Sequence, residues 1–148
     1  MEFLEPSLVH RRLAADLGRE RRMIVGLGLD VVEVERIRNL YERHGARFLN
    51  RVFTAQEQAY ALEYAQPAER LAGRWAAKEA AVKALGGAEG VGWRELEIIR
   101  GPRGEPGLRL QGKALEQAKA LGADVFHLTI THAGGLAAAQ VILERTSG

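Results

Sequence analysis

The apolar run at residues 23–32 places the strongest constraint on the fold. It reads Met-Ile-Val-Gly-Leu-Gly-Leu-Asp-Val-Val and holds a single carboxylate, Asp30. A nearly continuous run of this length predicts a strand buried on both faces, because a half-exposed strand alternates apolar with polar residues. A carboxylate in such a strand must be compensated by a cation, a hydrogen-bond network or a metal. For Asp30 taken alone, a cap or ion pair at the strand's end is the simpler interpretation.

The remaining pattern predicts an α+β fold, with a mostly antiparallel sheet packed against helices. Helical spacing begins at Glu33, and Thr54-Ala55-Gln56-Glu57 is a capping box that opens a helix to about Tyr64. Pro67 precedes a long alanine-rich helix, and the glycines and prolines at 101–107 predict a hairpin loop. The later helices are expected at 68–85 and 113–121, and the later strands at 96–100, 108–111, 125–131 and 136–144.

Bulk properties exclude several classes of protein. The 148 residues form one ordinary domain, expected at 23–148, after an N-terminal extension at 1–22 with a short helical segment at 7–17. The net charge of +2 argues against a nucleic-acid-coating protein, and the lack of cysteine excludes disulfides and thiol catalysis. No apolar run approaches the roughly 20 residues of a membrane span, and the arginine-rich start has no secretory h-region. We expect a cytoplasmic protein that binds neither membrane nor nucleic acid.

The helix at 68–85 carries a second candidate feature. Trp75, Glu79 and Lys83 are four residues apart and form one column, and the rest of the stretch is mostly alanine. A solvated Glu–Lys pair would explain Glu79 alone. Together with Asp30, however, Glu79 would give the two carboxylates that typically hold Mg²⁺ beside a substrate diphosphate. Lys78 and Lys83 flank the glutamate and would neutralise phosphate charge.

Three weaker signals each allow two interpretations. Arg36, Arg43 and Arg47 recur at helical spacing, although Gly45 interrupts the series. They form either a solvated helix face or a docking surface for an acidic partner. His132 lies at the end of a predicted strand. It is either a polar turn residue or a group that contacts a phosphate or positions an attacking hydroxyl. The glycines at 26–28 and 86–92 lack a dinucleotide fingerprint or a P-loop, so they are expected to serve turns and close packing.

Five blocks in conserved order resemble the holo-acyl-carrier-protein synthase family, the small 4′-phosphopantetheinyl transferases. They lie at 23–33, 51–54, 71–80, 128–132 and 137–141. The most specific match is Trp-x-x-Lys-Glu-Ala-x-x-Lys, from Trp75 to Lys83, with Gly-x-Asp upstream. The resemblance implies the 4′-phosphopantetheinyl transferase fold. It also implies transfer of 4′-phosphopantetheine from coenzyme A to a serine of an acidic acyl carrier protein, with release of 3′,5′-ADP, in support of fatty acid biosynthesis.

The resemblance also implies roles for individual residues. Asp30 and Glu79 match the family's Mg²⁺ ligands, and Lys83 matches a lysine that stabilises the departing 3′,5′-ADP. These three and His132 form the implied catalytic set. The residues implied to line the coenzyme A site are Arg74, Lys78, Lys83, His132, and Gly104 with Pro106 in a loop beside the adenine. The residues implied to dock the carrier protein are Arg36, Arg43 and Arg47.

One departure indicates a subfamily. Larger two-domain relatives have an acidic residue two places after the metal aspartate, where this chain has Val32. The resemblance therefore favours the short, homotrimeric subfamily, whose active sites lie between neighbouring subunits. Two other functions remain possible from the residues alone: a different Mg²⁺-dependent phosphate enzyme such as a nucleotide hydrolase, and a non-catalytic module that binds acidic proteins through the arginines.

Overall fold

The computed structural model describes residues 22–87 and 89–146, and the predicted helical segment at 7–17 lies outside them. The element order confirms the predicted alternation of strands and helices. The elements are β1 Met23–Glu33, α2 Val34–His44, α3 Ala46–Val52, α4 Ala55–Leu62, α5 Pro67–Ala84, the 3-10 turn η2 Trp93–Glu95, β2 Leu96–Arg100, β3 Pro106–Leu110, α6 Gly112–Ala120, β4 Val125–Ala133 and β5 Leu136–Arg145.

The strands form two antiparallel sheets. A three-stranded sheet has the order β1-β5-β4, and β2 pairs with β3 in a separate hairpin. Asp30 lies opposite Ala139 of the central strand, which lies opposite Ile130 on the far edge. The predicted α+β class with antiparallel pairing is therefore confirmed, although the strands are divided between two sheets.

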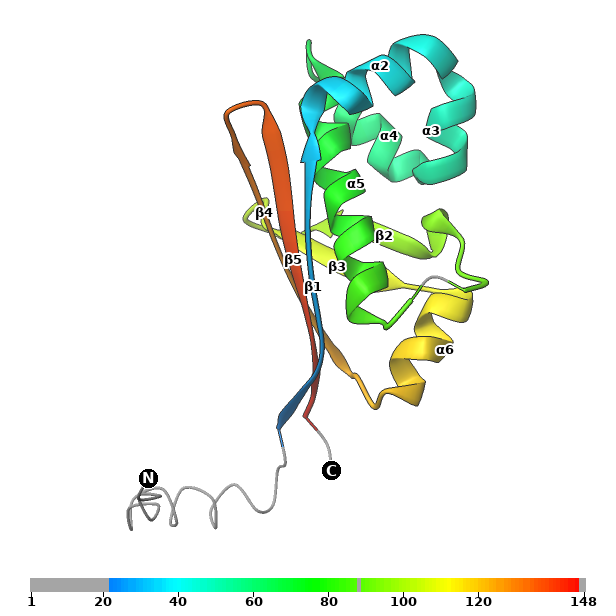
Figure 1. The fold of residues 1–148 in the computed structure, drawn as a ribbon, viewed down its shortest axis with the longest axis vertical. Helices are drawn as coiled ribbons and strands as arrows, with labels where there is room; N and C mark the ends of the chain where they lie inside the picture. Colours follow the sequence, from blue (N-terminus) through cyan, green and yellow to red (C-terminus); the bar gives the residue numbers. More distant parts are fainter. Residues whose placement is uncertain (1–21, 88, 147–148) are drawn as a thin grey trace, which may run out of the picture.

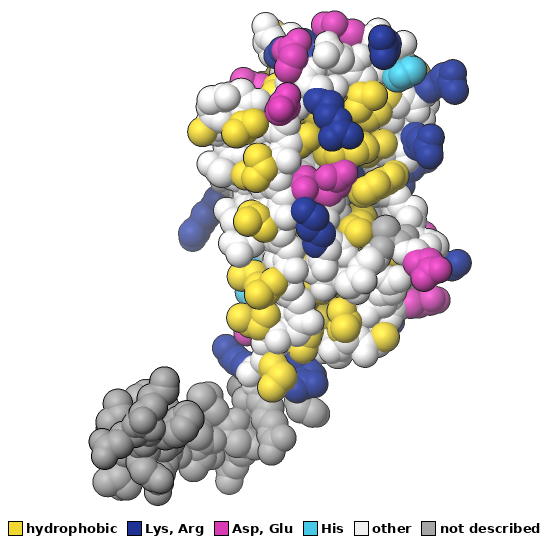
Figure 2. Space-filling model, viewed as in Figure 1, with side chains coloured by type: hydrophobic (Ala, Val, Ile, Leu, Met, Phe, Trp, Pro, Cys, Tyr) yellow, Lys and Arg dark blue, Asp and Glu magenta, His cyan; other side chains and the backbone are white. Residues whose placement is uncertain are grey.

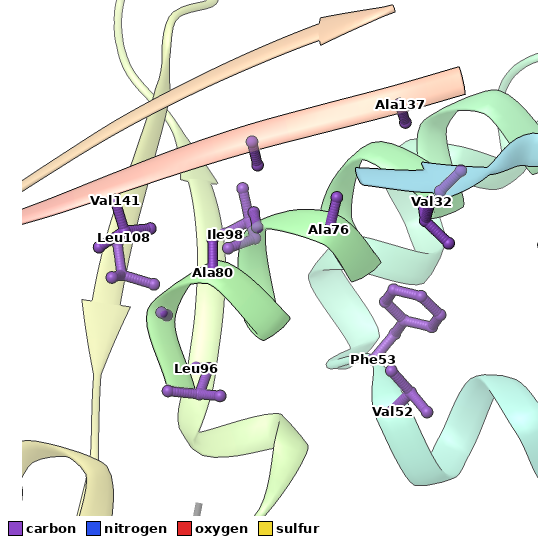
Figure 3. Packing of buried hydrophobic residues seen from close by; sticks show 14 of the residues in the cluster. Val32, Val52, Phe53, Ala76, Ala80, Leu96, Ile98, Leu108, Ala137 and Val141 are labelled. Atoms are coloured by element: carbon purple, nitrogen blue, oxygen red, sulfur yellow. The ribbon is translucent and has the colours of Figure 1, made fainter. Parts of the chain in front are cut away.

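Helix α5 is the centre of the packing (Figure 1). It contacts both β1 and β5, and its alanines are almost all fully buried. Figure 3 shows Ala76 and Ala80 pointing towards β5, while Leu96 and Phe53 lie on the other side of the helix. Because alanine side chains are short, the helix backbone lies close to the sheet, and the few long side chains of α5 emerge at its two flanks.

Gly26 and Gly28 explain how close that approach is. A Cβ atom on Gly28 would lie 1.8 Å from the Ala80 carbonyl oxygen, and one on Gly26 would lie 2.3 Å from the Ala84 carbonyl oxygen. No side chain fits at such distances, so β1 needs glycine at both of these positions. The predicted close-packing role of these glycines is confirmed.

The prediction that β1 is buried on both faces is wrong for the single chain. Its residues alternate, and Leu27, Leu29 and Val31 are 60%, 59% and 55% exposed on the face turned away from α5. Hydrophobic side chains are visible along the sheet side of the molecule in Figure 2. The chain thus has an apolar sheet face that no other described residue covers.

Two local signals behave as their chemistry predicts. Gly45 adopts φ 49° and ends α2, so the arginine series divides between α2 and a separate helix, α3. Thr54 accepts from the Glu57 backbone N–H, and the Glu57 side chain accepts from the Thr54 N–H, which completes the predicted capping box. The chain leaves α3 and enters α4 without a long connection, and α2–α4 cover one end of α5 (Figure 1).

Candidate active site

Asp30 lies on the face of β1 that packs against α5, because it continues the alternation of Gly26 and Gly28. Its side chain is only 11% exposed. Lys83, on α5, donates from Nζ to Asp30 Oδ1 at 3.0 Å and to the Leu29 carbonyl oxygen at 3.0 Å. The other carboxylate oxygen, Oδ2, is buried and has no hydrogen-bond partner among the described residues. One side of this carboxylate therefore remains available to a cation.

Glu79 lies one helical turn before Lys83 on α5 and is close enough to Asp30 to be affected by it, so the three side chains form one cluster between β1 and α5, the Asp30–Glu79 crevice. Burial and the neighbouring Asp30 carboxyl group together raise the pKa of Glu79 to about 7, against the opposing charges of Arg36 and Lys83. A glutamate whose ionisation is disfavoured by a neighbouring aspartate indicates an incompletely neutralised anionic site. The structure thus brings together the strand aspartate and the helix glutamate that sequence reasoning paired.

The pair fits a magnesium ion on chemical grounds. Mg²⁺ takes oxygen ligands, retains several waters, and is commonly held by one or two carboxylates plus substrate phosphates. The described residues contain no group of three or more acidic or histidine side chains that would enclose a metal without substrate. Asp30 and Glu79 would therefore hold the ion only in part, leaving the rest of its coordination to a diphosphate and water.

The predicted docking arginines lie on two helices, α2 and α3. Arg36 and Arg43 of α2 line a shallow hollow with Leu40, and Arg36 is close enough to Glu79 to affect its ionisation. Arg47, on α3, lines a second pocket of about 400 Å³. Its other lining residues are mainly apolar: Leu40, His44, Phe48, Arg51, Val52, Trp75 and Trp93. Figure 2 shows Lys and Arg side chains around hydrophobic ones in the region of α2 and α3.

Arg74 lies in a different environment, on the other flank of α5. It is only 6% exposed, its guanidinium lies 4.0 Å from the Tyr60 ring centroid, and burial lowers its pKa. Arg100 of β2 lies over the same ring at 4.4 Å. Both arginines line a polar pocket of about 470 Å³. Sequence reasoning did not single out Tyr60 or Arg100, because their place in this pocket depends on stacking between elements that are distant in the sequence.

His132 and the hairpin residues lie on this second side as well. His132 is near the end of the edge strand β4, and its Nε2 hydrogen-bonds the Glu69 carbonyl oxygen of α5 at 2.9 Å. Gly104 adopts φ 81° in the β2–β3 turn, and Pro106 begins β3. In the single chain none of these residues reaches the Asp30–Glu79 crevice.

Helical geometry explains the division. At 100° per residue, Arg74 and Glu79 project from α5 about 140° apart, and the sheet-facing alanines occupy the remaining arc of about 220°. Asp30 and His132 are on opposite edges of the sheet, separated by β5. The predicted site residues therefore form two groups on opposite flanks of α5, one with Asp30, Glu79 and Lys83 and one with Arg74 and His132.

Lys78 is placed differently from the expectation that it flanks the phosphates. Its side chain is fully buried, and Nζ lies 2.8 Å from Glu57 Oε1, 3.0 Å from the Trp93 carbonyl oxygen and 2.6 Å from the Leu96 carbonyl oxygen. An ammonium group has three N–H donors. Three partners occupy all of them, so Lys78 has no donor left for a ligand in this structure.

Comparisons with known proteins agree with this fold. Residues 26–139 match the family model described as the 4′-phosphopantetheinyl transferase superfamily, and the chain belongs to that superfamily. Among the described residues, no helix combines the length and apolar character required to cross a membrane.

Three relatives identify the branch of the superfamily to which the chain belongs. A holo-[acyl-carrier-protein] synthase of Anaeromyxobacter dehalogenans is 54% identical over 84% of this chain and 98% of its own length. The solved enzyme of Neisseria meningitidis is 31% identical, with a TM-score of 0.73 over 82% of this chain and 98% of its own. That of Bacillus anthracis, in complex with coenzyme A (3′,5′-ADP), is 33% identical, with a TM-score of 0.69 over 84% of this chain and 99% of its own. Within the superfamily, the chain belongs with the holo-[acyl-carrier-protein] synthases.

Proposed function

We propose that this chain transfers 4′-phosphopantetheine from coenzyme A to a serine of an apo-acyl carrier protein, releasing 3′,5′-ADP in a Mg²⁺-dependent reaction. It would act in the cytoplasm and support fatty acid biosynthesis. The observation that carries the proposal is the convergence of Asp30 and Glu79 in one crevice, with Lys83 bonded to the aspartate. Relatives with this fold include one solved with coenzyme A.

The residues of the crevice have distinct tasks in this proposal. Asp30 and Glu79 hold the metal, which when bound neutralises charge on the diphosphate. Lys83 holds Asp30 in place and presents the remaining positive charge of its ammonium to the leaving 3′,5′-ADP. Phosphoryl-type transfer is accelerated mainly by positioning and charge neutralisation. None of these side chains therefore needs to form a covalent intermediate with the substrate.

A direct test uses apo-carrier protein, coenzyme A and Mg²⁺, followed by mass spectrometry of the carrier. Addition of one phosphopantetheine, absent without Mg²⁺ and absent in Glu79→Ala, supports the proposal. Hydrolysis of coenzyme A or another nucleotide without a mass gain would instead favour a Mg²⁺-dependent hydrolase. Carrier binding without any chemistry would favour a docking module.

The arginines of α2 and α3 are the proposed carrier-docking surface, defined as Arg36, Arg43 and Arg47. An acidic helix would gain electrostatic steering from them. The apolar pocket between Phe48, Trp75 and Trp93 adjoins Arg47 and would accept an apolar side chain of the same helix. A mixed surface of this kind favours a carrier that is acidic with exposed apolar residues.

Replacing Arg43 with glutamate is expected to raise the KM for carrier protein about tenfold, as for a loss of about 1.4 kcal/mol. The KM for coenzyme A should remain unchanged, because Arg43 is not among the residues placed at the metal crevice. Arg36→Glu should raise the carrier KM and also lower kcat, since Arg36 influences Glu79. Steady-state kinetics with each substrate varied will measure both. Arg38→Glu, on the same helix, is the matched control, and equal losses for both substrates in Arg43→Glu would contradict the docking role.

We also propose that the protein is a homotrimer. Leu27, Leu29 and Val31 expose an apolar face that the single chain does not cover. In addition, the two groups of site residues lie on opposite flanks of α5, so an active site containing both requires two neighbouring chains. A copy of the same chain therefore explains both the apolar face and the divided site.

Light scattering is expected to give three times the chain mass of 16.2 kDa. Leu27→Lys/Leu29→Lys should lower the mass to that of one chain and abolish transfer. Refolding a mixture of Glu79→Ala and Arg74→Ala chains should restore activity that neither variant has alone, because some mixed sites would contain both native residues. A monomeric, active wild-type protein would disprove the proposed assembly.

A further inference from the structure

The buried ion pair of Lys78 and Glu57 connects four segments of the chain. Lys78 projects from the middle of α5 and binds the carbonyl oxygens of Trp93 in η2 and Leu96 in β2. Glu57 is 1% exposed, and its two carboxylate oxygens accept from the Thr54 and Ile98 backbone N–H groups at 2.8 and 2.9 Å. The pair thus joins α4, α5, η2 and β2 at one point.

This pair directly supports the wall of the apolar pocket. The Trp93 ring stacks on Trp75 with centroids 5.3 Å apart and an interplanar angle of 27°, and Trp75 packs against Phe48 at 5.9 Å. On the other side, the Lys78 ammonium lies 5.7 Å from the Phe53 ring, which makes an edge contact with Phe48 at 5.7 Å. Two short routes therefore lead from Lys78 to rings that line the pocket.

A purely stabilising role does not require an ion pair at this position. Burying two charges costs several kcal/mol per ion before pairing, and apolar residues of similar volume often stabilise a core equally well. A buried Lys–Glu pair does, however, fix geometry, because each of its hydrogen bonds has a set direction. Here that direction places the backbone of η2, and with it the Trp93 ring.

We propose that the Lys78–Glu57 pair is a positioning device for the apolar pocket, setting the affinity for the carrier protein through Trp93 and leaving coenzyme A binding unaffected. The inference rests on the proposed function, since it assigns the pocket to the carrier. It gives Lys78 a role in place of the phosphate contact that the family motif suggests.

The two tryptophans of the chain provide a readout that does not depend on catalysis. Trp75 and Trp93 are the only tryptophans in the sequence, and they stack on each other. Stacked indoles give an exciton couplet in circular dichroism. Lys78→Met is expected to remove or invert this couplet while far-ultraviolet helix content is retained. Lys119→Met, an exposed lysine on α6, is the matched control and should leave the couplet intact.

Kinetics then separate positioning from ligand binding. Lys78→Met is expected to raise the carrier KM about tenfold, as for a loss of about 1.4 kcal/mol, without changing the KM for coenzyme A. Trp93→Leu should have the same profile. In the double variant the two effects should not add, because Lys78 acts through the Trp93 ring.

Each other outcome counts against the inference. An unchanged couplet in Lys78→Met, additive effects in the double variant, or a raised KM for coenzyme A with normal carrier KM would overturn it. If Lys78→Met does not fold, Trp93→Leu alone tests the inference. An unaltered carrier KM in that variant would exclude the pocket from carrier binding and overturn the inference. A wild-type protein that transfers nothing would refute the proposed function, whereas the couplet would still show whether Lys78 positions Trp93.

Discussion

Glu79→Gln is expected to abolish phosphopantetheine transfer and, without magnesium at pH 8, to make the protein more stable than the wild type. Loss of one of the two carboxylates proposed to bind the metal should lower kcat/KM by about a thousandfold, or about 4 kcal/mol. The stability gain has a separate cause. In the metal-free protein, Glu79 and Asp30 lie close together, and Lys83 and Arg36 neutralise only part of their negative charge.

The raised pKa fixes the direction of the pH dependence. The folded protein holds a proton on Glu79 up to about pH 7, whereas the unfolded chain releases it near the ordinary glutamate pKa of 4.5. Wild-type stability should therefore fall as the pH rises through that window and stay lower above it. Because Glu79 is partly exposed, solvent screening reduces the penalty from about 3 to about 1 kcal/mol.

Thermal unfolding at several pH values will test this. Glu79→Gln should raise Tm by about 3 °C at pH 8 and leave it unchanged near pH 4. Added Mg²⁺ should stabilise the wild type and not the variant. Glu116→Gln, an exposed glutamate on α6, is the control. A variant that is inactive but destabilised at pH 8 would mean that Glu79 is part of a structural network and that the crevice is not a metal site.

Gly28→Ala is expected to destabilise the protein by about 3 kcal/mol or more and to inactivate what remains folded. The added Cβ would lie 1.8 Å from the Ala80 carbonyl oxygen, and backbone atoms cannot move aside as a flexible side chain can. Helix α5 would have to move away from β1. That movement would separate Glu79 from Asp30, so the metal crevice would open together with the core.

Denaturant unfolding and the transfer assay measure these two consequences. Gly92→Ala is the matched control, because a Cβ there meets its nearest neighbour at 3.6 Å and the residue has ordinary negative φ. It should change stability by no more than about 0.5 kcal/mol. A Gly28→Ala protein with wild-type stability and activity would show that close contact between β1 and α5 is dispensable.

Much of the local structure was predictable from the sequence. The apolar run at 23–32, the capping box at Thr54 and the alanine-rich helix each gave an element close to its observed bounds. Because a helix repeats every 3.6 residues, Glu79 and Lys83 were expected on one helix flank, and Asp30 was expected in the strand at 23–32. Their convergence follows once the two elements pack.

The sequence by itself thus determined the elements, the class of fold and the two carboxylates that we propose as metal ligands. Only the tertiary structure decided that Lys78 turns inward to Glu57, that Arg74 stacks on Tyr60, and that one face of β1 is left uncovered. The physical reason is that periodicity sets the direction of a side chain relative to its own helix or strand. Which neighbour lies in that direction depends on residues distant in sequence, as Glu57 and Lys78 demonstrate.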